Sequence, residues 1–262
     1  MQQTCKLILA VFAGIAGAAC GLHAASAQDA TTPSGYQFLV TPYLWLASVH
    51  TTMSTPLARE PQVDSNVSTI DLLSHLEGAP FMGSAEVRYG SLGFLVDAIH
   101  LPVSTKITTR DIFFQGGNAA LKADTGTGIA LYRFFQDPVQ FADGGLGFRA
   151  WGFSSNLTLN PGRLEGQALN RTGSWTDPLI GGRYHRDLGN GFGLTAYGDV
   201  GGFGVGAHAD WQVLGTVDYS LNPSWDLHLG YRSLNFSITG SEGRFGFDVH
   251  MRGPIIAGTF RF

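Results

Sequence analysis

Charged side chains recur at every second position in several segments of this 262-residue chain. In SWDLHLGYRS (224–233), Asp226, His228 and Arg232 alternate with Trp, Leu and Tyr, and in FMGSAEVRY (81–89) Glu86 and Arg88 follow the same rule. Alternate residues of an extended strand share one face. Carboxylates, imidazoles and guanidinium groups on one face can pair as ions, line a polar conduit or transfer protons.

Acid–base chemistry near the ends of the predicted strands has five candidates, since an aspartate and a histidine together can act as a general base. These candidates are His50, Asp71, His75, His208 and Asp210. The Gly-x-Ser-x-Gly pattern is absent, and no protease or lipase motif is recognisable. We therefore expect that the chain is not an enzyme. The eight histidines lack ligand spacing such as H-E-x-x-H, so we expect no metal and no cofactor.

The glycine-rich stretch GDVGGFGVG (198–206) raises the question of a phosphate-binding loop. Such a loop needs a helix behind it, so that backbone N–H groups face the anion. The residues that follow, AHADWQVLGTVDYSL, alternate as a strand does. The stretch is therefore predicted to join two antiparallel strands, with glycine supplying unusual dihedral angles.

The N-terminus reads as a secretory signal peptide. Lys6 gives a positive start, residues 7–22 are apolar or small, and Ala25-Ser26-Ala27 fits the cleavage rule, so residues 1–27 are predicted to be removed. Both cysteines fall inside this segment, which leaves residues 28–262 without a disulfide or a thiol nucleophile. The net charge of −4 argues against a nucleic-acid partner.

No apolar run of 18 residues occurs after the signal, which excludes spanning helices but not spanning strands. Alternation predicts ten strands, with eight as the alternative because 119–134 and 139–152 alternate poorly. The ten candidates span 36–47, 80–90, 92–103, 119–134, 139–152, 174–187, 191–202, 207–221, 224–236 and 245–262.

Short turns are predicted on one side of these strands and longer polar connections on the other. This asymmetry is typical of a closed, antiparallel, up-and-down transmembrane β-barrel with short periplasmic turns and longer extracellular loops. Aromatic residues near the strand ends fit interfacial girdles: Tyr43, Trp45, Tyr89, Tyr132, Phe134, Trp211, Tyr219 and Trp225. In the first long loop, Ser68 to Asp71 predict the start of a short helix that covers the mouth or lies against the rim.

Charges in such a barrel belong in the lumen, because a charged side chain facing lipid costs about 2–4 kcal/mol at mid-membrane. The predicted lumen network comprises Glu86, Arg88, Asp97, Arg149, Asp199, Asp218, Asp226, Arg232, Asp248 and Arg252. Arg183, Asp210, His228, His250 and Arg261 share its phase. Two interpretations remain open: paired charges that fill a narrow interior, or a narrow polar conduit.

The last strand ends IIAGTFRF, and its phase slips near Gly253-Pro254, which predicts a β-bulge. An alternating aromatic strand ending in Phe260 and Phe262 resembles the signal by which the barrel-assembly machinery recognises bacterial outer-membrane barrels. The resemblance implies localisation in the bacterial outer membrane, with lipid and lipopolysaccharide as surroundings.

Three stretches, 38–46, 70–101 and 181–236, resemble a group of small proteobacterial outer-membrane β-barrel proteins, broadly similar to the opacity-type porin families. The resemblance implies an architecture and no catalytic residues. We therefore expect an integral outer-membrane barrel that is structural or passes small solutes through a narrow lumen. The alternatives are an enzyme at the extracellular rim, a surface adhesion or interaction protein, and a soluble periplasmic β-protein.

Overall fold

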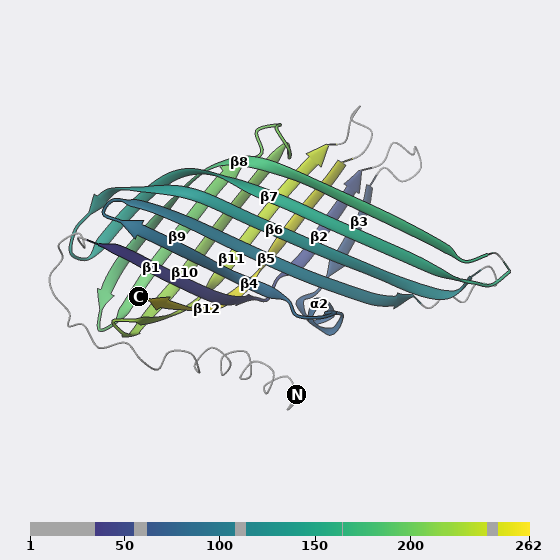
Figure 1. Ribbon diagram of the computed structural model, residues 1–262, viewed down its shortest axis with the longest axis horizontal. Coiled ribbons are helices and arrows are strands. Elements are labelled where there is room, and N and C mark those ends of the chain that lie inside the picture. Colours follow the sequence, from purple (N-terminus) through teal and green to yellow (C-terminus); the bar gives the residue numbers. More distant parts are fainter. Residues whose placement is uncertain (1–34, 55–61, 108–113, 164, 240–245) are drawn as a thin grey trace. The chain divides into compact units, whose positions relative to one another are not determined.

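The computed structural model describes residues 35–54, 62–107, 114–163, 165–239 and 246–262 (Figure 1). The predicted signal peptide lies outside the described residues. The strands are β1 (Tyr36–Trp45), β2 (Ser48–Ser54), β3 (Gln62–Val67), β4 (Phe81–Tyr89), β5 (Leu92–Ile107), β6 (Phe114–Gln136), β7 (Gln140–Pro161), β8 (Gln167–Gly189), β9 (Phe192–Gly201), β10 (Ala209–Asn222), β11 (Trp225–Thr239) and β12 (Gly246–Arg261). One short helix, α2 (Thr69–Ser74), follows β3.

The sheet closes on itself because β1 pairs with β4 on one side and with β12 on the other, antiparallel in both cases. The sheet has twelve strands. Of these, β2 continues from β1 and pairs with residues 246–252 of β12, and β3 pairs with β2. The other ten strands form the wall. The predicted closed antiparallel barrel of ten strands is confirmed, and the eight-strand alternative is wrong.

The two ends of the barrel differ in their connections. Gly90-Ser91, Asn190-Gly191 and Pro223-Ser224 form tight turns, and residues 137–139 form a fourth, all at the end where β1 begins and β12 finishes. The chain reversals at the other end include the β2–β3 hairpin and the 202–208 loop. In that loop Gly202 and Gly204 take positive φ angles of 84° and 75°, as the glycine-rich stretch predicted.

Several strands run further than predicted at the end with long connections. The segments 104–118 and 153–173, expected to be polar loops, consist mostly of β-strand, because β6, β7 and β8 are 23, 22 and 23 residues long. Outside a bilayer both faces of a strand meet water, so the alternation that reveals a strand in the sequence is lost while the hydrogen-bonded ladder continues. These strands form the extension at the right of Figure 1.

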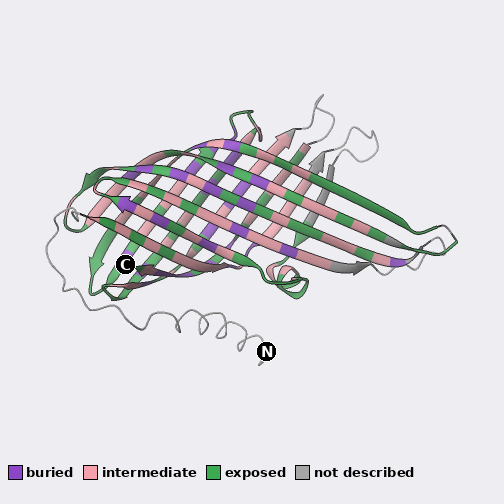
Figure 2. Cartoon of the chain, in the orientation of Figure 1, coloured by how far each residue is buried: buried purple, intermediate pink, exposed green. Residues whose placement is uncertain are grey.

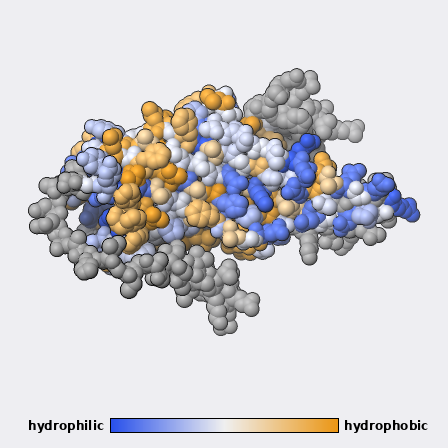
Figure 3. Space-filling view, in the orientation of Figure 1, coloured by the Kyte–Doolittle hydropathy of each residue, from blue (hydrophilic) through white to orange (hydrophobic). Residues whose placement is uncertain are grey.

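The outer face of the wall carries an apolar belt. Exposed and more buried positions alternate along the strands (Figure 2), and the exposed positions include Phe38, Phe94, Phe148, Val213 and Leu229. Hydrophobic residues gather at the left and centre of the face shown in Figure 3, whereas the extension at the right is mostly hydrophilic. An exposed apolar band around a closed barrel is the surface that a bilayer requires. The barrel and its belt confirm the expected localisation in the bacterial outer membrane.

The C-terminal strand differs from the prediction. The β11–β12 register runs without a shift from Trp225↔Phe260 to Thr239↔Gly246, so β12 has no bulge at Gly253-Pro254. Gly253 instead lies where the chain passes from β1 to β2, and a Cβ on it would stand 2.0 Å from the carbonyl oxygen of Leu46. What changes along β12 is the polarity of one face, which is charged at Asp248 and Arg252 and apolar at Ile256 and Phe260.

The predicted short helix is present. Ser68 caps α2, its hydroxyl accepting from the backbone N–H of Asp71 at 3.2 Å. Leu76 forms a bridge with Val103 of β5, and Ile70 and Leu73 are exposed, so α2 lies beside the wall. No helix in the described part of the chain is long and apolar enough to cross a membrane.

Candidate functional site

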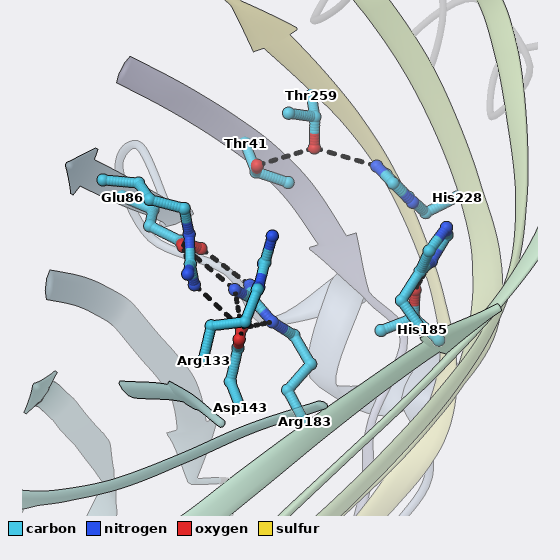
Figure 4. A network of polar contacts seen from close by, with 10 residues as sticks. Thr41, Glu86, Arg133, Asp143, Arg183, His185, His228 and Thr259 are labelled. Atoms are coloured by element: carbon cyan, nitrogen blue, oxygen red, sulfur yellow. Dashed lines mark hydrogen bonds and ion pairs between the residues drawn. The ribbon is translucent and has the colours of Figure 1, made fainter. Parts of the chain in front are cut away.

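The lumen near the short turns holds a group of five charged residues, which we name the arginine cluster: Glu86, Arg88, Arg133, Asp143 and Arg183 (Figure 4). Asp143 accepts hydrogen bonds from all three arginines, with closest distances of 2.8 Å to Arg88, 2.8 Å to Arg133 and 2.7 Å to Arg183. Glu86 accepts from Nη1 of Arg183 at 2.6 Å. The cluster joins β4, β6, β7 and β8 across the interior.

A second group, the central cluster, surrounds Arg149 of β7. Its guanidinium contacts Asp199 of β9 at 2.8 Å, Asp210 of β10 and the hydroxyl of Thr127 at 3.1 Å. The side chains of Arg149, Asp199 and Asp210 are fully buried. A guanidinium can bind two carboxylates at once because its donors are held in a planar fork. Arg149 therefore ties three wall strands together through the lumen.

Arg232 of β11 makes the third connection. It donates to Asp97 of β5 at 2.9 Å, to the hydroxyl of Tyr43 at 2.8 Å and to the side-chain oxygen of Gln212 at 2.8 Å. The Arg232 guanidinium also lies 5.0 Å from the ring centroid of Trp45, in range for a cation–π contact. This group connects β5 and β11, which the closed sheet separates by three strands (β4, β1 and β12) on one side and by five on the other.

A chain of polar groups lies near the short turns on the other side of the lumen (Figure 4). Asp218 accepts from Thr195 at 2.5 Å and contacts Nδ1 of His228 at 2.7 Å. The other ring nitrogen of His228 lies 2.8 Å from the hydroxyl of Thr259, which contacts Thr41 at 2.7 Å. Nearby, Asp226 pairs with Arg261 at 2.5 Å.

A cluster of apolar side chains, which we call the plug, lies in the lumen on the side of the charged groups away from the short turns. Trp151 stacks on Trp175 with ring centroids 5.8 Å apart, and Phe236 lies 4.5 Å from Trp151. The buried members of this plug are Trp45, Ala47, Ile99, Trp151, Leu234 and Ile255. The indole N–H of Trp151 donates to Asp210 at 2.9 Å, so the plug rests directly on the central cluster. The plug and the ionic groups therefore occupy successive levels of the interior.

Eight of the ten predicted lumen charges lie in these groups: Glu86, Arg88, Asp97, Arg149, Asp199, Asp218, Asp226 and Arg232. Asp248 and Arg252 are placed differently, which corrects the prediction. Met251 packs against the plug, so Asp248 and Arg252, which have the opposite phase, face outward on β12. An outward charge of this kind requires that this part of β12 meets water and not lipid.

Sequence reasoning missed other residues of the lumen. Asp143 and Asp177 share the phase of Arg149 and Arg183 along their strands, and this phase is the signal that would have found them. Tyr43 and Trp45 were assigned to an interfacial girdle but point inward to Arg232 and the plug. Aromatic character alone does not distinguish a girdle from a plug.

The five acid–base candidates do not form one site. Asp210 is buried against Arg149 and Trp151, whereas His50 contacts Asn66 at 2.6 Å in the β2–β3 hairpin. His75 contacts the backbone oxygen of Asp71 at 2.7 Å. Hydrogen bonding from the Ser68 hydroxyl holds the pKa of Asp71 below its ordinary value. Among the described residues no group of three or more His, Cys, Asp or Glu side chains is arranged to hold a metal ion.

The closed wall and its apolar belt define the class: an integral β-barrel of the outer-membrane type. No family model matches the chain, and no curated protein matches it. Among solved structures, the outer membrane protease OmpT of Escherichia coli is similar, with 10% sequence identity, a TM-score of 0.52 and coverage of 90% of this chain and 99% of that one. Neisserial surface protein A has 14% identity, a TM-score of 0.32 and coverage of 87% and 99%. Ail of Yersinia pestis has 11% identity, a TM-score of 0.35 and the same coverage. At these identities the likeness to OmpT shows the fold alone.

The comparison with OmpT corrects one expectation. We expected no enzyme because the sequence lacks a protease or lipase motif, yet a solved structure with the same fold is a protease. A barrel of this fold can therefore be an enzyme. The absence of a protease or lipase motif from this sequence is not a reason to exclude enzymatic activity.

Proposed function

We propose that this protein is a sealed structural barrel of the outer membrane that presents its long strands at the cell surface. The observation that carries the proposal is the burial of Arg149, Asp199 and Asp210 in one ion-paired group across the lumen. In a narrow barrel, side chains that pair across the interior close it, whereas a wide porin has an open channel in the same place. The filled lumen therefore favours paired charges over a narrow conduit.

The extension supports the second half of the proposal. Strands β6, β7 and β8 continue beyond the apolar belt, and Gln167 to Thr172 of β8 are all exposed. A polar sheet that stands beyond the membrane is a surface for contact with other molecules, and this favours the surface-interaction role as the second candidate. The resemblance of 38–46, 70–101 and 181–236 to opacity-type proteins is consistent with that role.

The surroundings of the barrel follow from the same proposal. The apolar belt would contact outer-membrane lipid and lipopolysaccharide. Phe260 and Phe262 would form the signal read by the barrel-assembly machinery, and their rings lie 5.5 Å apart at the end of β12. Phe262 also exchanges backbone hydrogen bonds of 3.0 Å with Phe38, so the C-terminus closes the barrel against β1.

Planar-bilayer recording tests the seal. The purified full-length barrel, inserted into a bilayer at either voltage polarity, should show no defined conductance steps. Reproducible single-channel openings would contradict the sealed barrel and support the conduit.

Epitope insertion tests the orientation of the extension. A tag inserted at Gly162, in the β7–β8 connection, should bind antibody on intact cells. The same tag inserted at Asn190, in a short turn, should bind only after the outer membrane is permeabilised. The reverse pattern would contradict display of the extension at the cell surface.

A further inference from the structure

The arginine cluster contains more positive than negative groups. Three guanidinium groups (Arg88, Arg133 and Arg183) surround two carboxylates, those of Glu86 and Asp143. The simple ion pairs elsewhere in the lumen, Arg232–Asp97 and Arg261–Asp226, are one to one. The central cluster has the opposite imbalance, with Arg149 between two carboxylates, so the positive surplus is local to the arginine cluster.

One donor in the cluster lacks a protein acceptor. Nη1 of Arg88 has no hydrogen-bond partner among the described residues, although Arg88 is only 5% exposed. Its Nε donates to Glu86 at 3.1 Å and its Nη2 to Asp143 at 2.8 Å. Buried N–H groups of a charged side chain are almost always satisfied, so this nitrogen points to an acceptor that the protein does not supply.

Two local features shape the arginine cluster. Gly93 of β5 leaves room for the Arg88 guanidinium, since a Cβ there would stand 3.0 Å from Nη2. The ring of Phe141 lies 3.7 Å from the Arg133 guanidinium and 5.6 Å from that of Arg183. An aromatic face attracts these cations without neutralising them, because it carries a quadrupole and no formal charge. The surplus charge remains available to an anion.

We propose that the periplasmic mouth of the barrel binds one small inorganic anion of chloride or bromide size against Nη1 of Arg88. The anion reaches this position from the side of the short turns, where the side chains of Arg133 and Arg183 keep 14% and 17% of their surface exposed. It completes the charge balance of the cluster and supplies the missing acceptor. This binding goes beyond the proposed structural role, since the anion is held at the mouth of a lumen closed further along.

Bromide serves as the probe. The purified, folded full-length barrel in zwitterionic detergent is titrated with sodium bromide, with gluconate keeping the ionic strength constant, and the ⁸¹Br NMR line width is recorded. A saturable broadening that chloride reverses is expected. Broadening that rises without saturation, as for adventitious surface association, would overturn the proposal.

Variants locate the site. Arg88→Gln should abolish the saturable component, while Arg261→Gln should leave it unchanged, because Arg261 pairs with Asp226 alone at the same end of the barrel. Circular dichroism establishes that each variant is folded. Should Arg88→Gln fail to fold, Arg133→Gln, at the more exposed edge of the cluster, should weaken bromide binding at least threefold. Undiminished binding in the folded Arg88→Gln variant, or in Arg133→Gln, would overturn the proposal.

Discussion

Arg149 of β7 and Asp199 of β9 meet at 2.8 Å with both side chains fully buried. The strand between them, β8, separates the two in the wall, so this ion pair passes through the interior of the barrel. Asp210 of β10 binds the same guanidinium. The contact shows why charges alternate so regularly in the sequence: they connect strands that the sheet itself keeps apart.

Replacing Arg149 should be among the most damaging single changes in the lumen. Arg149→Ala leaves the carboxylates of Asp199 and Asp210 buried without their cation, and loss of one partner of a buried pair costs about 3–5 kcal/mol. Urea unfolding in lipid vesicles, followed by tryptophan fluorescence, should show this loss in the free energy of unfolding. As the control, His100→Ala should cost less than about 1 kcal/mol, because the side chains of His100 and its partner Asp124 are 43% and 55% exposed. Equal losses in the two variants would contradict a special role for the central cluster.

Asp143 should be nearly as sensitive, because it is the carboxylate shared by three arginines. Asp143→Asn keeps the shape of the side chain but leaves Glu86 as the only anion facing three cations, so a loss of about 3–5 kcal/mol is expected. Asp226→Asn is the matched change, since Asp226 serves the exposed Arg261. Unfolding midpoints in urea compare the two variants, and an Asp143→Asn barrel as stable as the Asp226→Asn barrel would refute the shared-anion account.

Trp151 joins the apolar plug to the central cluster. Trp151→Phe retains an aromatic ring near Trp175 and Phe236 but removes the indole N–H that Asp210 accepts. Loss of a hydrogen bond to a buried charged group is expected to cost about 1–3 kcal/mol. Trp151→Ala removes the ring as well and should cost about 3–5 kcal/mol. If the two variants have the same unfolding free energy, the ring does not pack as a plug.

The pH dependence expected outside the membrane centres on Asp71. The Ser68 hydroxyl lowers the pKa of Asp71, so its carboxylate stabilises the start of α2 above the ordinary pKa near 3.8, and this contribution disappears as the pH falls through the lowered value. Ser68→Ala should therefore raise the pKa of Asp71 toward 3.8. The carboxyl ¹³C shift of Asp71, titrated by NMR, measures the change. An unchanged titration in Ser68→Ala would show that another group sets the pKa.

The sequence allowed the barrel, and much of its lumen, to be predicted for a single physical reason. Lipid forces charge inward, so the phase of Glu86 and Arg88 reveals the inner face of β4. Where lipid ends the rule ends, and this explains why Asp248 and Arg252 were placed on the wrong face of β12. The pairing of the lumen charges could not be predicted. Which aspartate contacts Arg149 depends on strand tilt and register, and alternation carries no information about either.

Thiol labelling of a lumen position tests the sealed lumen most directly. The chain has two cysteines, both within the predicted signal peptide, so Thr127→Cys introduces a single reporter. Thr127 is 5% exposed and contacts Arg149. In the folded barrel a charged methanethiosulfonate reagent should modify this cysteine at least 100-fold more slowly than Asn170→Cys on the exposed β8 extension. The two rates should become equal in urea. Comparable rates in the folded barrel would show that water and ions reach the lumen, and would contradict the account.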